Sequence, residues 1–184
     1  MTVGLFVRSR FLPAMSAVML AAGWLTVPVA QASECPSTNV GGKAIGWIEF
    51  ANSRVPIKQF DYPAGGELDP PASAAVVGAS SLHRPLLSKK GTTVLAWHVR
   101  YGAGCKGALN PLLKRPIGAT FDIVTASGSR QTFKLVDKTT VKRGNYKPEW
   151  FRVNGPAQVA MFTCSDLRNG KFNKTSALFA EPVL

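Results

Sequence analysis

Residues 121–135 read FDIVTASGSRQTFKL and carry the clearest fold signal in the chain. Two runs in which apolar and polar residues partly alternate flank the segment Ala126-Ser127-Gly128-Ser129. Alternation turns one side of each run toward a core, and a short turn containing Gly joins antiparallel strands. The segment therefore predicts a β-hairpin.

Similar short runs rich in Val, Ile, Phe and Thr recur along the chain, separated by Gly, Pro, Asn and Ser. Apolar residues do not repeat at helical spacing over any long stretch, so the chain is predicted to be mainly β. The predicted strands are residues 44–50, 55–59, 74–77, 93–100, 120–125, 131–137, 158–164 and 177–180. Eight short strands fit a barrel or a sandwich.

Two segments between the strands have a different character. Residues 106–115 predict a short helix, with Asn110 as its cap and Pro111 at the first helical position. Residues 138–155 read as a long basic connection, and a long loop in a compact domain is more often functional than idle.

The N-terminal segment predicts export. Arg8 and Arg10 precede residues 11–29, which carry no charge, and Ala30-Gln31-Ala32 follows. This pattern indicates a signal peptide over residues 1–32 that is cut after Ala32. A retained membrane anchor stays an alternative, because the apolar run could just about span a bilayer. The remainder divides into an N-terminal arm, residues 33–45, and one domain, residues 46–184, that is secreted or associated with the cell surface or wall.

The chain is strongly basic, with a formal charge of +12, or +10 once Arg8 and Arg10 are removed. Outside the cytoplasm the available polyanions are wall polymers, lipid headgroups and acidic glycans. The basic residues are scattered, without the aromatic interleaving or the motifs of nucleic-acid binders. We therefore expect no nucleic-acid partner, and an anionic wall polymer is a candidate. Three Cys and two His without metal-binding spacing predict neither a metal nor another cofactor.

His98 and Cys164 each end an apolar run, where a strand gives way to a polar loop. A strand end holds a side chain rigidly at a rim that is open to substrate. A thiol becomes a nucleophile as thiolate, which an adjacent imidazolium stabilises. The alternatives are a buried structural thiol or half of a disulfide for Cys164, and a structural role for His98.

Four motifs occur in an order that is similar to one known family. They are Arg54-Val55-Pro56-Ile57, Val94-Leu95-Ala96-Trp97-His98, residues 108–121 and Phe162-Thr163-Cys164. Together they resemble the sortases, bacterial surface transpeptidases, and most closely their class F-type actinobacterial branch. Trp97 stands where that family usually has Gly. The resemblance covers residues 46–183 and implies a single closed eight-stranded β-barrel with one or two short helices.

The resemblance also implies a chemistry. Cys164 would attack the Thr carbonyl of a Leu-Pro-x-Thr-Gly sorting signal, hold it as a thioester and pass it to an amine acceptor. His98 would be the acid and base. The family's third residue is an arginine that steadies the oxyanion, but Asn173 stands at its aligned position. Arg168 is the slightly favoured substitute and Lys174 the other, and the substitution leaves activity in doubt.

Four residues are expected to bind substrate: Thr163, Tyr146, Trp150 and Phe151. The three aromatic residues among them could equally pack their loop down. If Cys164 stays reduced, Cys35 and Cys105 are left to form a disulfide.

Two other functions stay open. One is a weak or inactive sortase-like basic module that binds anionic wall polymer or a partner protein. The other is a thiol peptidase that hydrolyses wall peptides.

Overall fold

The computed structural model describes residues 42–61, 68, 70–101 and 104–184. The predicted signal peptide, Cys35 and most of the predicted N-terminal arm lie outside the described residues. Among the residues that are described, no helix has both the length and the apolar character needed to cross a bilayer.

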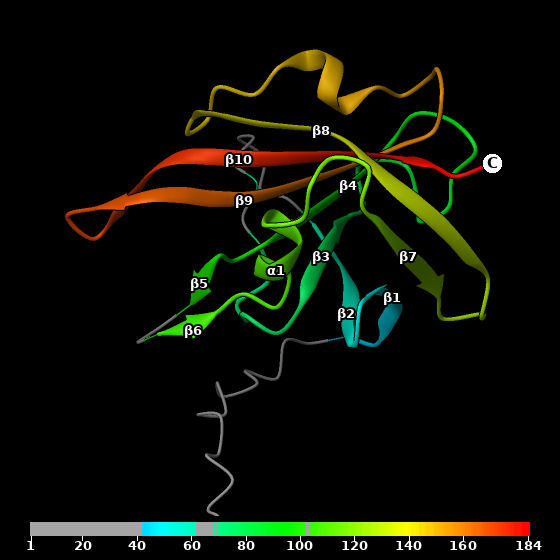
Figure 1. The fold of residues 1–184 in the computed structure, drawn as a ribbon, viewed down its shortest axis with the longest axis horizontal. Helices are drawn as coiled ribbons and strands as arrows, with labels where there is room; N and C mark the ends of the chain where they lie inside the picture. Colours follow the sequence, from blue (N-terminus) through cyan, green and yellow to red (C-terminus); the bar gives the residue numbers. More distant parts are fainter. Residues whose placement is uncertain (1–41, 62–67, 69, 102–103) are drawn as a thin grey trace, which may run out of the picture. The chain divides into compact units, whose positions relative to one another are not determined.

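The described residues form a closed β-barrel with the strand order β1-β2-β3-β4-β9-β10-β8-β7 (Figure 1). This confirms the predicted eight-stranded, mainly β fold. Its strands are β1 (Ala44–Phe50), β2 (Ser53–Phe60), β3 (Val77–Ser80), β4 (Thr92–Trp97), β7 (Thr120–Thr125), β8 (Arg130–Lys142), β9 (Gln158–Arg168) and β10 (Lys171–Pro182). Beside the barrel lie the short strand pair β5 (Arg100–Tyr101) and β6 (Cys105–Lys106), the helix α1 (Asn110–Leu113) and the 3-10 helix η1 (Pro148–Phe151).

The predicted hairpin forms from β7 and β8, which pair antiparallel. Phe121 lies opposite Phe133, and their rings stack with centroids 5.9 Å apart. Gly128 supplies the positive φ of 90° in the turn, which a side chain would disfavour. The alternation read from the sequence therefore marks the face that enters the core.

Apolar side chains pack on both faces of the strands β4 and β9. Leu95, Trp97 and Met161 belong to the cluster inside the barrel. Ala96 and Phe162, the neighbours of these residues, belong to a second cluster on the outer face. Because both faces are covered, β4 reads as a continuous apolar run, as expected for a strand buried on two sides.

Several predicted boundaries were wrong. β3 begins at Val77, whereas Ala74 and Val76 are buried outside any strand and Ala75 is exposed. β8, β9 and β10 are longer than predicted, and their additional residues form a polar ribbon that Figure 1 shows reaching the turn between β9 and β10. Asn169 and Gly170 make that two-residue turn with φ angles of 51° and 75°, as a type I′ hairpin requires.

The predicted helix is present, but its cap was misassigned. The capping position is Leu109, and Asn110 is already helical. The Asn110 side chain instead contacts the segment around His98, as described below. Part of the predicted connection over residues 138–155 is regular secondary structure, because β8 extends to Lys142 and the 3-10 helix η1 follows.

Candidate active site

The strands β4 and β9 pair in parallel, with Trp97 opposite Thr163 as their last pair. His98 comes directly after the end of β4, and Cys164 is the next residue of β9. Neighbouring strands lie about 4.8 Å apart, so the register places these two residues side by side. Two residues that are far apart in the sequence are thereby brought to one end of one strand pair.

Both residues belong to the same face of the sheet. Successive side chains alternate between faces, and Trp97 lies in the cluster inside the barrel. Continuing this alternation one residue past β4 assigns His98 to the outer face, the face of Cys164, which follows Phe162 of the outer cluster by two positions. Each is partly exposed, so substrate could reach a thiol and an imidazole from the same side.

Thr163 locks the two strands together just before the site. It is 3 % exposed, and its Oγ1 donates a hydrogen bond of 2.8 Å to the Trp97 carbonyl oxygen. The sequence prediction gave Thr163 a role in binding substrate. In the structure its hydroxyl bridges β4 and β9, and Thr163 also lines the pocket beside Cys164, so the predicted role in binding substrate stays a prediction.

The backbone beyond β4 is clamped around His98. Gly107 donates its N–H to the Val99 carbonyl oxygen at 3.0 Å, and the Asn110 Nδ2 donates to the same oxygen at 2.7 Å. A Cβ added to Gly107 would lie 1.8 Å from the His98 carbonyl oxygen, so only glycine fits there. The Tyr101 ring packs on the imidazole with centroids 5.0 Å apart. The position of His98 is therefore fixed by its surroundings.

Cys164 lines a small pocket whose volume of about 10 Å³ corresponds to roughly one water molecule. Thr175 of β10 lies opposite Cys164 in the antiparallel register. The described residues around the thiol are Leu68, Pro70, Arg143, Tyr146, Phe162, Thr163 and Thr175. This lining combines apolar side chains with one guanidinium, a combination suited to an apolar peptide with a reactive carbonyl.

The three predicted aromatic residues divide into two roles. Trp150 is 7 % exposed and packs on Phe162 and Phe179, so it anchors η1 to the barrel. Phe151 stacks on Phe162 with ring centroids 5.5 Å apart. Tyr146 contacts Phe162 edge-on and also lines the Cys164 pocket. Only Tyr146 of the three reaches the described lining of that pocket.

The three residues predicted to replace the family arginine gather around Asp166, away from the pocket. The Arg168 Nε lies 2.8 Å from one Asp166 carboxylate oxygen, and the Lys174 Nζ lies 3.6 Å from the other. The Asn173 Nδ2 donates to the Asp166 carbonyl oxygen at 3.3 Å. The hydrogen bond from Arg168 is the main cause that lowers the pKa of the Asp166 carboxyl.

Arg143 is the residue that the sequence prediction missed. It follows β8 directly, and its backbone N–H donates to the Asn173 carbonyl oxygen at 2.9 Å. Among the described residues that line the Cys164 pocket, it is the only Arg or Lys. Its sequence context, inside what reads as a loop, carried no signal of this position.

The cysteines differ in state. Cys164 is a thiol, whereas Cys105 is in a disulfide. Cys35 lies outside the described residues, so the Cys35–Cys105 pairing stays a prediction. Within the described part of the chain, His, Cys, Asp and Glu side chains form no group of three or more that could hold a metal.

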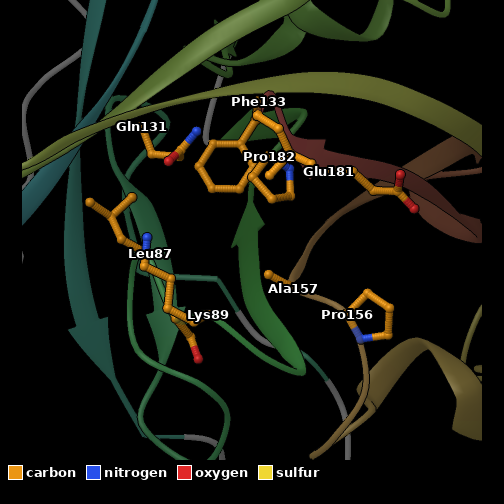
Figure 2. A pocket seen from close by; sticks show the side chains of 10 residues that line it. Leu87, Lys89, Gln131, Phe133, Pro156, Ala157, Glu181 and Pro182 are labelled. Atoms are coloured by element: carbon orange, nitrogen blue, oxygen red, sulfur yellow. The ribbon is translucent and has the colours of Figure 1, made fainter.

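A larger cavity, of about 490 Å³, lies elsewhere (Figure 2). Figure 2 shows Leu87, Phe133 and Pro182 around it, with Lys89 and Glu181 as charged members of its lining. Ala157, also in the lining, precedes β9, seven residues before Cys164. At about 3.3 Å per residue the cavity is therefore about 23 Å from the thiol, at the opposite end of the strand.

Comparison with solved structures defines the fold. No protein-family model matches the sequence, and no curated protein is significantly similar to it. The structural neighbours are sortases, and the barrel described above has the sortase fold.

Three of these neighbours illustrate the similarity. Sortase C-1 from Actinomyces oris has a TM-score of 0.59 and 17% identity, over 78% of this chain and 75% of that one. Sortase A from Corynebacterium diphtheriae has a TM-score of 0.59 and 14% identity, over 78% and 62%. Sortase C1 of Streptococcus agalactiae, solved in complex with MTSET, has a TM-score of 0.58 and 14% identity, over 77% and 68%.

Proposed function

We propose that the protein is an exported cysteine transpeptidase that cleaves a Leu-Pro-x-Thr-Gly type sorting signal and transfers the acyl part to an amine. The observation that carries the proposal is the parallel register of β4 and β9. The last pair of that register is Trp97 with Thr163, so His98 and Cys164 each follow it directly, and Cys164 lines a pocket. Export rests on the predicted signal peptide, and the sorting substrate on the sortase resemblance.

In the first half of the reaction, the Cys164 thiolate attacks the Thr carbonyl carbon of the signal. The carbonyl π electrons move onto oxygen and form a tetrahedral oxyanion. When this collapses, the Thr–Gly C–N bond breaks, and His98 as imidazolium gives its proton to the departing Gly amine. The product is a thioester on Cys164.

In the second half, an amine attacks the thioester carbonyl and loses a proton to neutral His98. The C–S bond then breaks, which restores the thiolate and the imidazolium. No oxidant, metal or cofactor enters this cycle. If water replaces the amine, the same steps give hydrolysis.

The surroundings of the thiol support an apolar peptide substrate. Leu68, Pro70, Tyr146 and Phe162 supply apolar surface at the pocket. A pocket with room for about one water has to widen before it accepts a peptide side chain. A Leu-Pro segment suits these walls because both side chains lose unfavourable contact with water on binding.

The test is to incubate the exported chain with a Leu-Pro-x-Thr-Gly peptide and to record intact mass over one day. We expect an acyl adduct on Cys164 and, with added amine, a transfer product. Cys164→Ala should show neither. His98→Gln should lose cleavage, while His83→Gln, a matched change of the other histidine, should keep it. Absence of both adduct and cleavage in the unmodified chain would refute the proposal.

The same experiment distinguishes the other functions. Cleavage without transfer to added amine would indicate a hydrolytic thiol peptidase. Salt-sensitive retention on an anionic polymer, unchanged in Cys164→Ala and without cleavage, would indicate the basic binding module.

A further inference from the structure

A developing oxyanion needs positive charge or hydrogen-bond donors close to the reacting carbonyl. The sequence suggested Arg168, Asn173 or Lys174 for that role. Both cationic side chains of this set are paired with the Asp166 carboxylate, which lies two residues beyond Cys164. The two cations thus share one carboxylate, and neither is among the described residues that line the Cys164 pocket.

Arg143 lines the Cys164 pocket from the turn that follows β8. Thr175 lies opposite both Cys164 on β9 and Val141 on β8, so these three residues share one face. Arg143 follows Val141 by two positions, and its N–H bonds to the Asn173 carbonyl oxygen, which continues the β8–β10 pairing. Because side chains alternate along a strand, Arg143 falls on the face of Cys164. Its presence in the pocket lining agrees with this.

The chain around Arg143 is fixed from both sides. The pairing of Lys142 with Lys174 precedes it, and the aromatic contact of Tyr146 with Phe162, at 5.8 Å between centroids, follows it. Both anchors hold the connection against the outer face of the barrel. Arg143 is an exposed residue, so its side chain is accessible to a substrate that binds at the pocket.

We infer that Arg143, from the end of β8, is the cation of the active site. It stabilises the Cys164 thiolate before substrate binds, and it donates hydrogen bonds to the substrate carbonyl oxygen as that oxygen becomes negative. A guanidinium suits the second task because its planar fork presents two parallel N–H donors. The oxyanion role rests on the proposed function, whereas the effect on the thiolate does not.

The elements next to Cys164 carry other charged or titratable groups, and the experiment has to separate their effects from that of Arg143. Each comes from a neighbouring element: His98 after β4, Tyr146 before η1, Asp166 and Arg168 on β9, and Lys174 on β10. Single variants keep all of these groups except the one that is changed. Arg168→Ala is the matched control, because it removes the same charge from the Asp166 cluster.

The experiment measures alkylation of Cys164 by iodoacetamide as a function of pH, read by peptide mass with Cys164→Ala as background. In Arg143→Ala we expect the apparent thiol pKa to rise and the rate at pH 7 to fall about three- to tenfold, because less thiolate is present. Arg168→Ala should change the rate less than twofold. An unchanged profile in Arg143→Ala, or equal shifts in both variants, would overturn the inference.

Peptide cleavage separates this inference from the proposed function. Arg143→Lys keeps the charge without the fork, so it should keep the alkylation profile and lose cleavage about tenfold or more. If the unmodified chain cleaves no peptide but Arg143→Ala shifts the thiol, the proposed function fails and the Arg143–thiolate link stands. If the unmodified chain and Arg143→Ala cleave the peptide equally fast, the inference about Arg143 fails and the proposed function stands.

Discussion

The two ends of the strand pair β4–β9 differ in size and in chemistry. One end carries a cavity of about 490 Å³ with mainly apolar walls, and the other a pocket for about one water beside Cys164. Each end also has a histidine, since His83 lies near the start of β4 and His98 follows its end. Among the described residues, the end with the smaller pocket differs in having a thiol, Cys164, with Arg143 in the same pocket lining. Cavity size is therefore a poorer guide to reactivity in this barrel than the side chains that converge.

Replacing one side chain at each end by Ala gives the largest expected difference in peptide cleavage. Cys164→Ala should abolish the acyl adduct and slow peptide cleavage by about a thousandfold or more, because no other thiol can form the thioester. Glu181→Ala, which changes the large cavity, should stay within twofold. Intact mass and peptide cleavage measure both. A comparable loss in Glu181→Ala would show that the distant cavity takes part in the reaction.

The clamp around His98 can be broken by one methyl group. Gly107→Ala forces a Cβ against the His98 carbonyl oxygen, which should cost about 1–3 kcal/mol and lower the melting temperature by about 3 to 10 °C. Cleavage should fall as well because the imidazole is displaced.

Gly128→Ala is the matched control for that change. Its φ is 90° but no atom lies within 4 Å of the added Cβ, so it should cost about 1 kcal/mol and leave cleavage intact. Equal melting temperatures and equal cleavage rates in the two variants would show that Gly107 does not hold the backbone around His98.

The hydrogen bond between Thr163 and the Trp97 carbonyl oxygen can be tested by a substitution that preserves the shape of the side chain. Thr163→Val keeps the shape of the side chain but removes the hydroxyl that donates to the Trp97 carbonyl oxygen. The free energy of unfolding should fall by about 1–2 kcal/mol, as measured by denaturant titration. Thr140→Val loses an exposed hydroxyl contact with Ser176 and should change it by less than about 0.5 kcal/mol. Equally small changes in the free energy of unfolding for the two variants would show that Thr163 does not stabilise the strand pair.

The smallest expected effect concerns the other histidine. His83 accepts or donates a 2.7 Å hydrogen bond with Ser80 and packs on Phe151, and burial lowers its pKa below 6.5. The folded protein then binds a proton less readily than the unfolded chain. The contribution to stability is therefore complete above pH 6.5 and declines as pH falls below it toward the folded pKa.

Melting temperatures between pH 7.5 and 5 test this. The unmodified chain should lose more stability on acidification than His83→Gln, while peptide cleavage at pH 7.5 should be equal in both. Parallel melting curves would show that burial of His83 has no energetic consequence.

The strands were predicted best from the sequence where one face is buried, because burial requires apolar residues at alternating positions. β1 and β7 have the predicted bounds because alternating apolar residues mark their inner faces. The polar ends of β8, β9 and β10 left no such pattern, since backbone pairing rather than burial holds them. The dipeptide Asn169-Gly170 was a usable hairpin signal, and it would have lengthened β9 and β10.

The site was only partly accessible to the same reasoning. His98 and Cys164 stood out because each ends an apolar run, although their proximity depends on a parallel register that composition does not encode. Arg143 could not be found, because its place beside the thiol follows from the β8–β10 pairing and not from its neighbours in the sequence. Thr163 was recognised, but its hydrogen bond to Trp97 appears only once the strands are paired.

The parallel β4–β9 pairing also bears on how the molecule folds. Its partners at the site are 66 positions apart in the sequence, and parallel strands cannot be joined by a tight turn. Contacts of such long range form slowly, because the loop between them must first lose its freedom. The β7–β8 hairpin can form early, whereas β4 and β9 pair only when the barrel closes. The proposed peptide cleavage should consequently appear late in refolding and report on completion of the barrel.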